Sequence, residues 1–423
     1  MKPFKDLKAA FFFIAIIMIS NNLKSQTGFV WGKQFGSEKS EYALNHLIDE
    51  TGNIYIAGKT DGTIASKNFG RNDGFITMID SSANTTWSRQ FGTDGDEDIQ
   101  WSAIDNKGCV YITGSTTGVF DGKHFGKEDI FIIKYNPLGE VEWKKQFGTD
   151  STDIAKGIYA DNKGFIYLTG MTGGKLGPIS YGKTDAFLMK LDIKGNHIFT
   201  TQFGTSADDF SYAITGGPDS DLYVCGTTFG DIAGKNKGFM DGFTGQFTNR
   251  GDLIRYTQFG SEGFDLAMIL TVDEEKNIYT GGSTSGNFAC QQLGEGDCYL
   301  LKINDKGEIL WNNQFGTEHH DGIRSIAINT EISDKILVSG ILNLPPSQGF
   351  ISMFNKDGEQ LWERDYVARG SNLTTSGKDV NLDDKGNIYH MGLTGANMFG
   401  TSQGEADIYL VKLVLDSSYR IIK

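Results

Sequence analysis

The sequence predicts an all-β protein that is built from one unit repeated along the chain. The triplet Gln-Phe-Gly recurs every 56 residues, beginning at Gln34, Gln90 and Gln146. The 423 residues include 55 Gly but only 6 Pro, together with 29 Phe and 16 Tyr, a composition typical of many short strands joined by tight turns. No part of the repeated unit shows sustained helical periodicity.

Three signatures define the repeat, and comparison of the chain with itself is enough to find them. The Gln-Phe-Gly triplet continues at Gln202, Gln258 and Gln314. An apolar–Tyr–x–x–Gly run ends, in the same steps, at Gly58, Gly114, Gly170, Gly226 and Gly282, and less regularly at Gly340 and Gly392. A third motif, Asp-x-Phe/Tyr, begins at Asp73, Asp129, Asp185, Asp241, Asp297 and Asp407, with Gln348 in the sixth copy. The sequence therefore contains seven copies of one unit.

Each copy contains four strand-like runs, which in the first copy are residues 41–49, 53–60, 73–80 and 85–92. They are rich in Ile, Tyr, Phe and Thr, and Gly-containing turns such as "DETGN" separate runs one and two. In the second run both faces are apolar, so this strand must be covered on both sides. A four-stranded sheet of this kind, repeated seven times, buries its faces against its neighbours when the sheets are arranged radially.

We therefore predict a seven-bladed β-propeller of four-stranded antiparallel blades. A lone fourth-type strand, residues 28–36, precedes the first complete blade, and no fourth-type strand follows the last third-type strand, residues 407–415. The N-terminal strand should complete the last blade and close the ring.

The first 25 residues are typical of a secretory signal peptide. Three lysines precede the apolar run "AAFFFIAIIMIS", which is too short to cross a bilayer. We therefore divide the chain into a signal peptide, residues 1–25, and a propeller, residues 26–423. This division predicts export to the periplasm, the cell surface or the extracellular medium, and no membrane span after the signal is removed.

The net charge of −14 makes nucleic acid an unfavourable partner. An acidic surface favours cations or basic partners, or keeps an exported protein soluble. We expect the propeller to be a monomer.

The repeats closely resemble those of the bacterial seven-bladed β-propeller repeat (SBBP repeat) family. The motifs that carry the resemblance are "WxxQFGT", "DxxGNIYxxGxT" and "GxxDAFLxKxDxxGxxxW", as in residues 181–196, and they cover essentially the whole chain after residue 25. The resemblance implies an exported scaffold, often at a cell surface, whose ligands are mostly undefined.

The strictly repeated Trp, Phe and Gly residues have adequate packing reasons, so function is expected where the copies differ, on the longer loops. These loops connect strands two and three, and strand four to the next blade, and all open on one face. One acidic position on this face could form a ring around the channel mouth. A candidate ligand-binding set follows from it and from the histidines of the "TEHHDG" segment: Glu41, Glu97, Asp153, Asp209, Asp265, Asp321, His319 and His320.

Two further local features suggest chemistry. Asp94, Asp96 and Asp98 form a D-x-D-x-D run that could supply oxygen ligands to Ca²⁺, although the Gly of an EF-hand loop is missing; no other cofactor is expected. Cys290 and Cys298 flank one loop and could pair in an oxidising compartment, whereas Cys109 and Cys225 fall in strand-like runs and are expected to be buried free thiols.

Catalytic signatures such as G-x-S-x-G, H-E-x-x-H and the phosphate loop are absent from the sequence. We therefore expect a non-catalytic scaffold that binds a protein or glycan partner through the long-loop face. The alternative that the sequence leaves open is a secreted hydrolase or lyase with its site at the channel mouth.

Overall fold

The computed structural model describes residues 28–65, 67–329, 333–367 and 373–414 of the chain. The predicted signal peptide, residues 1–25, lies outside these residues. The described residues form strands, turns and loops, and within them no helix has the length and apolar character needed to cross a membrane.

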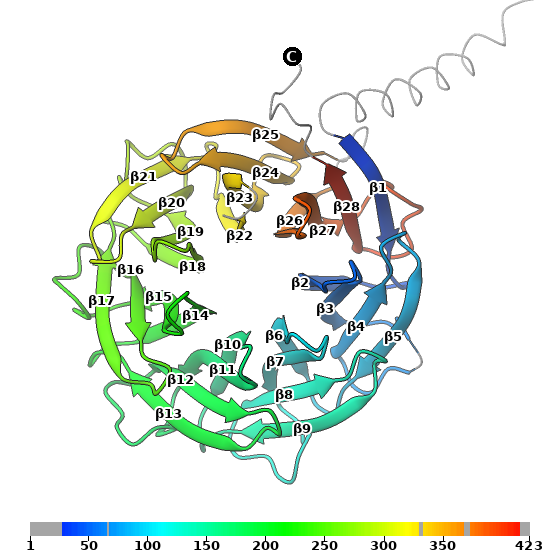
Figure 1. Ribbon diagram of the computed structural model, residues 1–423, viewed down its shortest axis with the longest axis horizontal. Coiled ribbons are helices and arrows are strands. Elements are labelled where there is room, and N and C mark those ends of the chain that lie inside the picture. The colour runs from blue at the N-terminus through cyan, green and yellow to red at the C-terminus, as the bar shows by residue number, and fades with distance from the viewer. Residues whose placement is uncertain (1–27, 66, 330–332, 368–372, 415–423) are drawn as a thin grey trace, which may run out of the picture.

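Seven four-stranded antiparallel sheets radiate from a common centre, as Figure 1 shows. The fold is the predicted seven-bladed propeller. Blades 1 to 4 comprise β2 (Glu41–Ile48), β3 (Ile54–Thr60), β4 (Asp73–Ile79) and β5 (Thr85–Phe91); β6 (Glu97–Ile104), β7 (Val110–Thr116), β8 (Asp129–Tyr135) and β9 (Val141–Phe147); β10 (Asp153–Ala160), β11 (Phe165–Thr172), β12 (Asp185–Asp192) and β13 (His197–Phe203); and β14 (Asp209–Gly216), β15 (Leu222–Thr228), β16 (Asp241–Phe247) and β17 (Leu253–Phe259). Blades 5 and 6 comprise β18 (Asp265–Val272), β19 (Ile278–Thr284), β20 (Asp297–Ile303) and β21 (Ile309–Phe315); and β22 (Gly322–Asn329), β23 (Ser333–Leu342), β24 (Gln348–Asn355) and β25 (Gln360–Tyr366).

Blade 7 joins the two ends of the described chain. Its inner three strands are β26 (Thr375–Leu382), β27 (Asn387–Thr394) and β28 (Asp407–Val414), and its outer strand is β1 (Gly28–Phe35). β1 pairs antiparallel with β28 from Gly28 opposite Val414 to Phe35 opposite Ile408. The predicted closure of the ring by the N-terminal strand is confirmed.

The core lies between neighbouring blades. The second and third strands of blade 2, β7 and β8, are buried along their whole length. Between blades 1 and 2, the ring of Phe91 lies 6.2 Å from that of Phe131 and 6.1 Å from that of Tyr135, measured between centroids. The repeated aromatic positions thus interlock one blade with the next, because neither face of a middle strand meets solvent.

The two faces of the ring differ in the length of their connections. Short turns such as residues 49–53 and 80–84 open on one face, the short-turn face, and Gly52 adopts a positive φ of 83° in such a turn. The connections from the second to the third strand, such as residues 61–72, and from each blade to the next, such as residues 92–96, open on the other face, which we call the long-loop face. In blade 6 the second-to-third connection shrinks to residues 343–347.

Removal of residues 28–36 should destabilise the whole ring. The deletion leaves the edge of β28 unpaired and uncovers the apolar face that β1 protects. We expect the midpoint of thermal unfolding to fall by roughly 10 °C or more. Addition of a synthetic peptide of residues 28–36 should raise the midpoint again, and a scrambled peptide should not. An unchanged midpoint in the deletion variant would contradict the closure.

Candidate functional site

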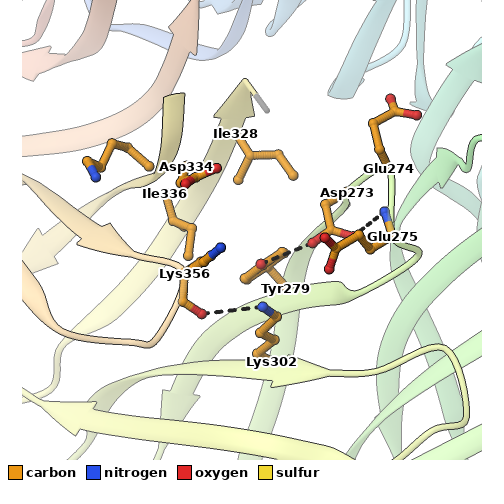
Figure 2. Close-up of a pocket in the computed structure, with 10 residues that line it drawn as sticks. Asp273, Glu274, Glu275, Tyr279, Lys302, Ile328, Asp334, Ile336 and Lys356 are labelled. Atoms are coloured by element: carbon orange, nitrogen blue, oxygen red, sulfur yellow. Dashed lines mark hydrogen bonds between the residues drawn. The ribbon is translucent and has the colours of Figure 1, made fainter. Parts of the chain in front are cut away.

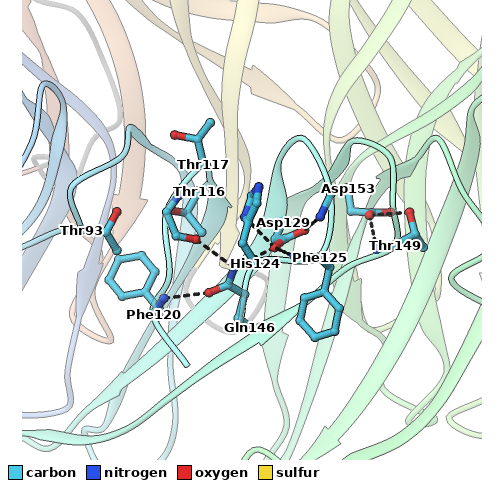
Figure 3. Close-up of polar contacts among 12 residues, drawn as sticks. Thr93, Thr116, Thr117, Phe120, His124, Phe125, Asp129, Gln146, Thr149 and Asp153 are labelled. Atoms are coloured by element: carbon cyan, nitrogen blue, oxygen red, sulfur yellow. Dashed lines mark hydrogen bonds and ion pairs between the residues drawn. The ribbon is translucent and has the colours of Figure 1, made fainter. Parts of the chain in front are cut away.

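The predicted acidic ring is not exposed. The six carboxylates begin the inner strands, or immediately precede the strand in blade 6, and each is at most 1% exposed: Glu41, Glu97, Asp153, Asp209, Asp265 and Asp321. Asp153 accepts hydrogen bonds from the backbone N–H of Thr149 at 2.6 Å and from its hydroxyl at 2.8 Å (Figure 3). The prediction that these six side chains face a ligand is therefore wrong: they tie each connecting loop to the strand that follows it.

A second buried carboxylate lies beside the first at each of these positions. Asp129, of the Asp-x-Phe motif, accepts a hydrogen bond at 2.8 Å from the side-chain amide of Gln146, of the Gln-Phe-Gly motif (Figure 3). The amide also donates to Gly118 O, and the amide oxygen accepts from the N–H of Phe120. The repeated Gln and Asp thus hold the second-to-third-strand loop against the outer strand.

The glycine of Gln-Phe-Gly separates two carboxylates. A Cβ placed on Gly92 would lie 2.5 Å from Asp73 Oδ1 and 2.8 Å from Glu97 Oε2, so no side chain fits there. Burial, opposed in part by hydrogen bonds, raises the pKa of five of the six inner-strand carboxyls, and in each the neighbouring Asp adds to the rise: Glu41, Glu97, Asp153, Asp209 and Asp265.

The three aspartates of the proposed calcium run do not converge. Asp94 is exposed, whereas Asp98 forms an ion pair with Lys59, whose Nζ lies 2.6 Å from Asp98 Oδ1. The side-chain amide of Gln100 also donates to Asp98. Within the described residues, no three His, Cys, Asp or Glu side chains are grouped so that they could hold a metal ion. The assignment of calcium to these three residues is therefore wrong.

The remaining predicted site residues are separate from one another. His319 and His320 lie on the long-loop face, in the connection from β21 to β22, and His319 Nε2 is 3.9 Å from Glu318 Oε1. Cys290 is exposed in the connection from β19 to β20, whereas Cys298 is fully buried on β20 between blades 5 and 6. Both are free, so the disulfide considered for them is not formed; Cys109 and Cys225 are buried free thiols, as predicted.

A β-bulge at the same position of every inner strand creates a ring of variable residues. In β2 the pairing with β3 skips from Ala43 to Asn45, leaving Leu44 unpaired, and the other six inner strands show the same irregularity. A bulge re-aims a side chain, and these seven lie about midway along the inner strands, which surround the central channel (Figure 1). The bulge ring consists of Leu44, Gln100, Lys156, Tyr212, Met268, Arg324 and Lys378.

Positive charge gathers at the bulge ring in an otherwise acidic protein. Three of the seven bulge-ring residues are basic. A fourth cation, Lys59 of β3, pairs with Asp98, which lies two residues before Gln100 of the ring. Lys156 Nζ donates to Gln100 Oε1 at 3.1 Å. Burial lowers the pKa of Lys156, and Asp98 and Glu128 partly offset this effect.

Lys378 is the most perturbed cation of the ring. Burial, together with the charges of Arg324 and Lys59, lowers the pKa of Lys378 to about 8. Arg324, by contrast, is exposed. A desolvated ammonium beside two other cations is costly to the fold, and such groups cluster at functional sites.

The channel widens beneath the ring into a cavity of about 310 Å³. Inner strands of all seven blades line it, and Tyr212 and Met268 belong both to the ring and to the cavity wall. Trp101 and Tyr159 add aromatic surface, and Asp379 adds a carboxylate that is engaged by His46 and Ser325. The cavity therefore extends from the level of the bulge ring towards the short-turn ends of the inner strands, such as Ile104 and Ala160.

Exposed aromatic side chains extend this face outwards over blades 4 and 5. Phe239 is 67% exposed and Phe264 is 44% exposed, yet their rings stack at 5.0 Å with an interplanar angle of 4°. Phe229, also exposed, packs at 6.2 Å on Phe210, which lies two residues before Tyr212 of the bulge ring. An exposed aromatic patch of this kind marks an interaction surface.

A second groove, of about 280 Å³, lies between blades 5 and 6 on the short-turn face (Figure 2). Tyr279 donates to Asp273 at 3.1 Å, and Lys302 lies 5.1 Å from the Tyr279 ring while donating to Lys356 O at 3.3 Å. Equivalent lysine–tyrosine contacts occur between Lys134 and Tyr111 in blade 2 and elsewhere. The side chains of this groove thus take part in packing that other blades share.

Sequence reasoning missed the bulge ring. Its signal was the fourth position of each inner strand, three residues after the repeated acidic residue, where an acidic chain places Lys156, Arg324 and Lys378. The strict repetition of the acidic residue drew attention away from its variable neighbour.

Comparison with known proteins agrees with this architecture. A family model described as "SBBP: Beta-propeller repeat" matches residues 142–178. The fold, a closed ring of seven four-stranded blades, defines the chain as a β-propeller. One segment of the repeat array therefore matches that family model, and the chain is similar to the SBBP-repeat β-propellers.

Similar solved structures share the fold at low sequence identity. The Pan2 WD40 domain of Neurospora crassa has a TM-score of 0.51 at 10% identity, with 88% of this chain and 89% of that chain covered. An ulvan lyase of polysaccharide lyase family PL25, solved with -[GlcA(1-4)Rha3S]- bound, has a TM-score of 0.50 at 10% identity, with 90% and 96% covered.

Two curated relatives match over part of this chain. They are an uncharacterized WD repeat-containing protein of Acanthamoeba polyphaga mimivirus, 21% identical over 38% of this chain, and the regulatory protein FlaEY of Caulobacter vibrioides, 27% identical over 32% of it. The matched segments span 15% and 16% of the length of those relatives.

The buried carboxylates predict how stability depends on pH. A carboxyl whose folded pKa is raised, such as that of Glu97, binds its proton more tightly in the folded state. The free energy of unfolding should therefore rise as pH falls from 7 towards the ordinary glutamate pKa of 4.5. Measured by urea unfolding, the rise in the free energy of unfolding should be smaller for Glu97→Gln than for the wild type. The control Glu262→Gln, at an exposed site, should show the same rise as the wild type. A Glu97→Gln variant with the wild-type pH dependence would contradict this assignment.

The lowered pKa of Lys378 predicts that the free energy of unfolding depends on pH with the opposite sign. Its folded pKa of about 8 lies below the ordinary value of 10.5, so the charged side chain destabilises the fold at pH 7. That penalty should disappear as pH rises from 8 towards 10.5. Lys378→Met should raise the free energy of unfolding at pH 7 by on the order of 1 kcal/mol, and this gain should shrink by pH 10. The exposed Lys194→Met, on the short-turn face, serves as the control; a Lys378→Met variant that is less stable than wild type at pH 7 would show that the ammonium is not under strain.

Proposed function

We propose that this protein is an exported, non-catalytic scaffold that binds a partner through its long-loop face. The observation that carries the proposal is the exposed, stacked pair Phe239 and Phe264, beside a channel mouth rimmed by variable residues. Aromatic side chains that remain exposed at a rigid surface are typical anchors of a binding interface. The ring supports this role, since buried carboxylates such as Asp129 and Asp153 hold the connecting loops that precede them.

Export follows from the charged and apolar pattern of residues 1–25, and it would place the propeller in the periplasm, on the cell surface or outside the cell. A protein or a glycan of that compartment is the expected partner. We further propose that the propeller acts as a monomer, because the closed ring leaves no blade incomplete.

A second candidate function is a secreted hydrolase or lyase with its site at the channel mouth. One observation favours it: Lys378, whose pKa is lowered to about 8, directly precedes Asp379, which lines the channel cavity. Release of products from a panel of polysaccharides and peptides, lost in Lys378→Met, would establish this activity in place of simple binding.

The partner-binding proposal predicts a loss of capture when the aromatic pair is removed. The purified propeller should retain a partner from an envelope extract, and Phe239→Ala/Phe264→Ala should retain at least tenfold less, because both anchors are lost. Leu138→Ala, which removes an exposed side chain from a turn on the short-turn face, is the matched control and should bind like wild type. Equal capture by the double variant and the wild type would refute a role for this surface.

A further inference from the structure

One repeated position of the second-to-third-strand connections carries an exposed aromatic ring in three adjoining blades. The residue four before the Asp of the Asp-x-Phe/Tyr motif is Phe69 in blade 1, Phe125 in blade 2 and Tyr181 in blade 3, and these residues are 41%, 37% and 48% exposed. The backbone N–H of each donates to that buried Asp at 2.7 Å. The same tether therefore holds the three residues at equivalent places on the long-loop face.

Basic residues flank these rings along the chain. The residues two positions before and two positions after each ring are all exposed: Lys67, Arg71, Lys123, Lys127, Ile179 and Lys183. Five of these six are cations and none is acidic, although the chain as a whole carries a net charge of −14. Blades 5 and 7 have Glu295 and Glu405 at the position after the ring. The basic and aromatic character thus belongs to one side of the propeller, and we call residues 67, 69, 71, 123, 125, 127, 179, 181 and 183 the basic–aromatic arc.

The polar side chains that alternate with the arc are engaged within the protein. The side-chain amide of Asn68 donates to two backbone carbonyls of its own loop, at 3.3 and 3.2 Å. His124 Nδ1 lies 3.0 Å from the buried carboxylate of Asp129 (Figure 3), and the hydroxyl of Ser180 donates to the equivalent carboxylate of blade 3. Apart from the hydroxyl of Tyr181, the side chains of the arc are therefore either cationic or apolar.

We propose that the basic–aromatic arc is a peripheral binding surface for an anionic lipid bilayer. Exposed cations pair with headgroup phosphates, and exposed apolar side chains enter the boundary between headgroups and acyl chains. The arc offers both kinds of group, on one face of the ring and across three blades, as contact with an extended surface requires.

An acidic glycan fits the arc less well. Phe69, Phe125 and Ile179 have no polar side-chain atom that could hold a sugar hydroxyl. The ring faces on which a sugar would stack are already occupied in two blades. Lys67 Nζ lies over the Phe69 ring at 5.0 Å from its centroid, and Lys123 Nζ lies over the Phe125 ring at 4.7 Å.

The bilayer is a second partner, independent of the one proposed for Phe239 and Phe264. Exposed carboxylates in the blade-to-blade connections of the same face, such as Asp94 and Asp150, reduce the attraction to an anionic surface. Binding should therefore be reversible and sensitive to salt.

Vesicle co-sedimentation tests the proposal. The protein is the chain without residues 1–25, because residues 28–414 supply every strand of the ring and the apolar run of residues 1–25 would itself bind lipid. Vesicles of phosphatidylglycerol and phosphatidylcholine in equal parts should bind it roughly tenfold or more tightly than vesicles of phosphatidylcholine alone, and about 0.5 M NaCl should remove the preference.

Variants locate the binding on the arc. Arg71→Gln/Lys127→Gln should weaken binding to the charged vesicles roughly tenfold or more, because each cation near an anionic surface contributes about fivefold. Phe69→Ala/Phe125→Ala should weaken it roughly fivefold or more, because the apolar contact is lost. All four side chains are exposed, so the thermal midpoints should match the wild type.

Matched controls lie on the short-turn face. Lys107→Gln/Lys194→Gln removes two exposed cations, and Leu138→Ala removes an exposed apolar side chain. Both variants should bind the charged vesicles like the wild type.

Equal binding to charged and neutral vesicles, or charged-vesicle binding that survives Arg71→Gln/Lys127→Gln, would overturn the proposal. Binding of soluble polygalacturonate through the same two cations, without binding to charged vesicles, would overturn it in favour of an acidic glycan. Phe239→Ala/Phe264→Ala should leave vesicle binding unchanged within about twofold, whereas it should abolish capture of the envelope partner. The two proposals can therefore fail separately.

Discussion

The fold depends on one buried interaction, the hydrogen bond from the Gln amide of each Gln-Phe-Gly motif to the Asp carboxylate of Asp-x-Phe/Tyr. In blade 1 it joins Gln90 Nε2 to Asp73 at 2.8 Å, and the same amide donates to Gly62 O, so one side chain fixes the outer strand, the third strand and the long loop together. A buried carboxylate without such donors would be destabilising by several kcal/mol. The Gln, the Asp and the Gly beside them must therefore recur as a set. Blade 6 changes them together: Gln348 and Asp365 stand at the two positions, and Tyr366, stacked at 5.5 Å on Tyr409, replaces the usual Phe.

The architecture could be predicted because it follows from the repeat period, and comparison of one chain with itself is enough to find that period. Strand limits expected from the first repeat agree with β2 to β5 to within one residue, and the unpaired first strand predicted the closure by β1. The site could not be predicted in the same way. Periodicity shows that Glu97 and its equivalents recur, but it does not show whether a carboxylate faces solvent or accepts hydrogen bonds from Thr93 and Thr116. The hydroxyl residues at those two repeat positions were the signal that these carboxylates have internal donors.

The bulge explains why each inner strand has one position that is fixed by the fold and another that is free to vary. At the repeated acidic position the side chain points into the blade junction, where only a carboxylate with matching donors fits. Three residues later the bulge leaves a residue out of the ladder, and its side chain, freed from the pairing, borders the channel. That position varies from Leu44 to Tyr212 to Arg324 because neither blade packing nor ladder pairing constrains it. Variation there costs the fold little, so the position is available for recognition.

The charges of the bulge ring also indicate that its residues are not chosen for stability of the fold. An acidic protein gains solubility from its net charge, but the ring places Arg324 and Lys378 near each other, where each lowers the stability of the other's charged form. A fold that needed only a plug for its channel would be more stable with apolar residues at those positions, as Leu44 and Met268 illustrate in blades 1 and 5. Charge that is kept at such positions in spite of its cost to the fold is typical of functional sites. The stability lost at Lys378 is thus the consequence of a partly buried ammonium that stands beside another cation.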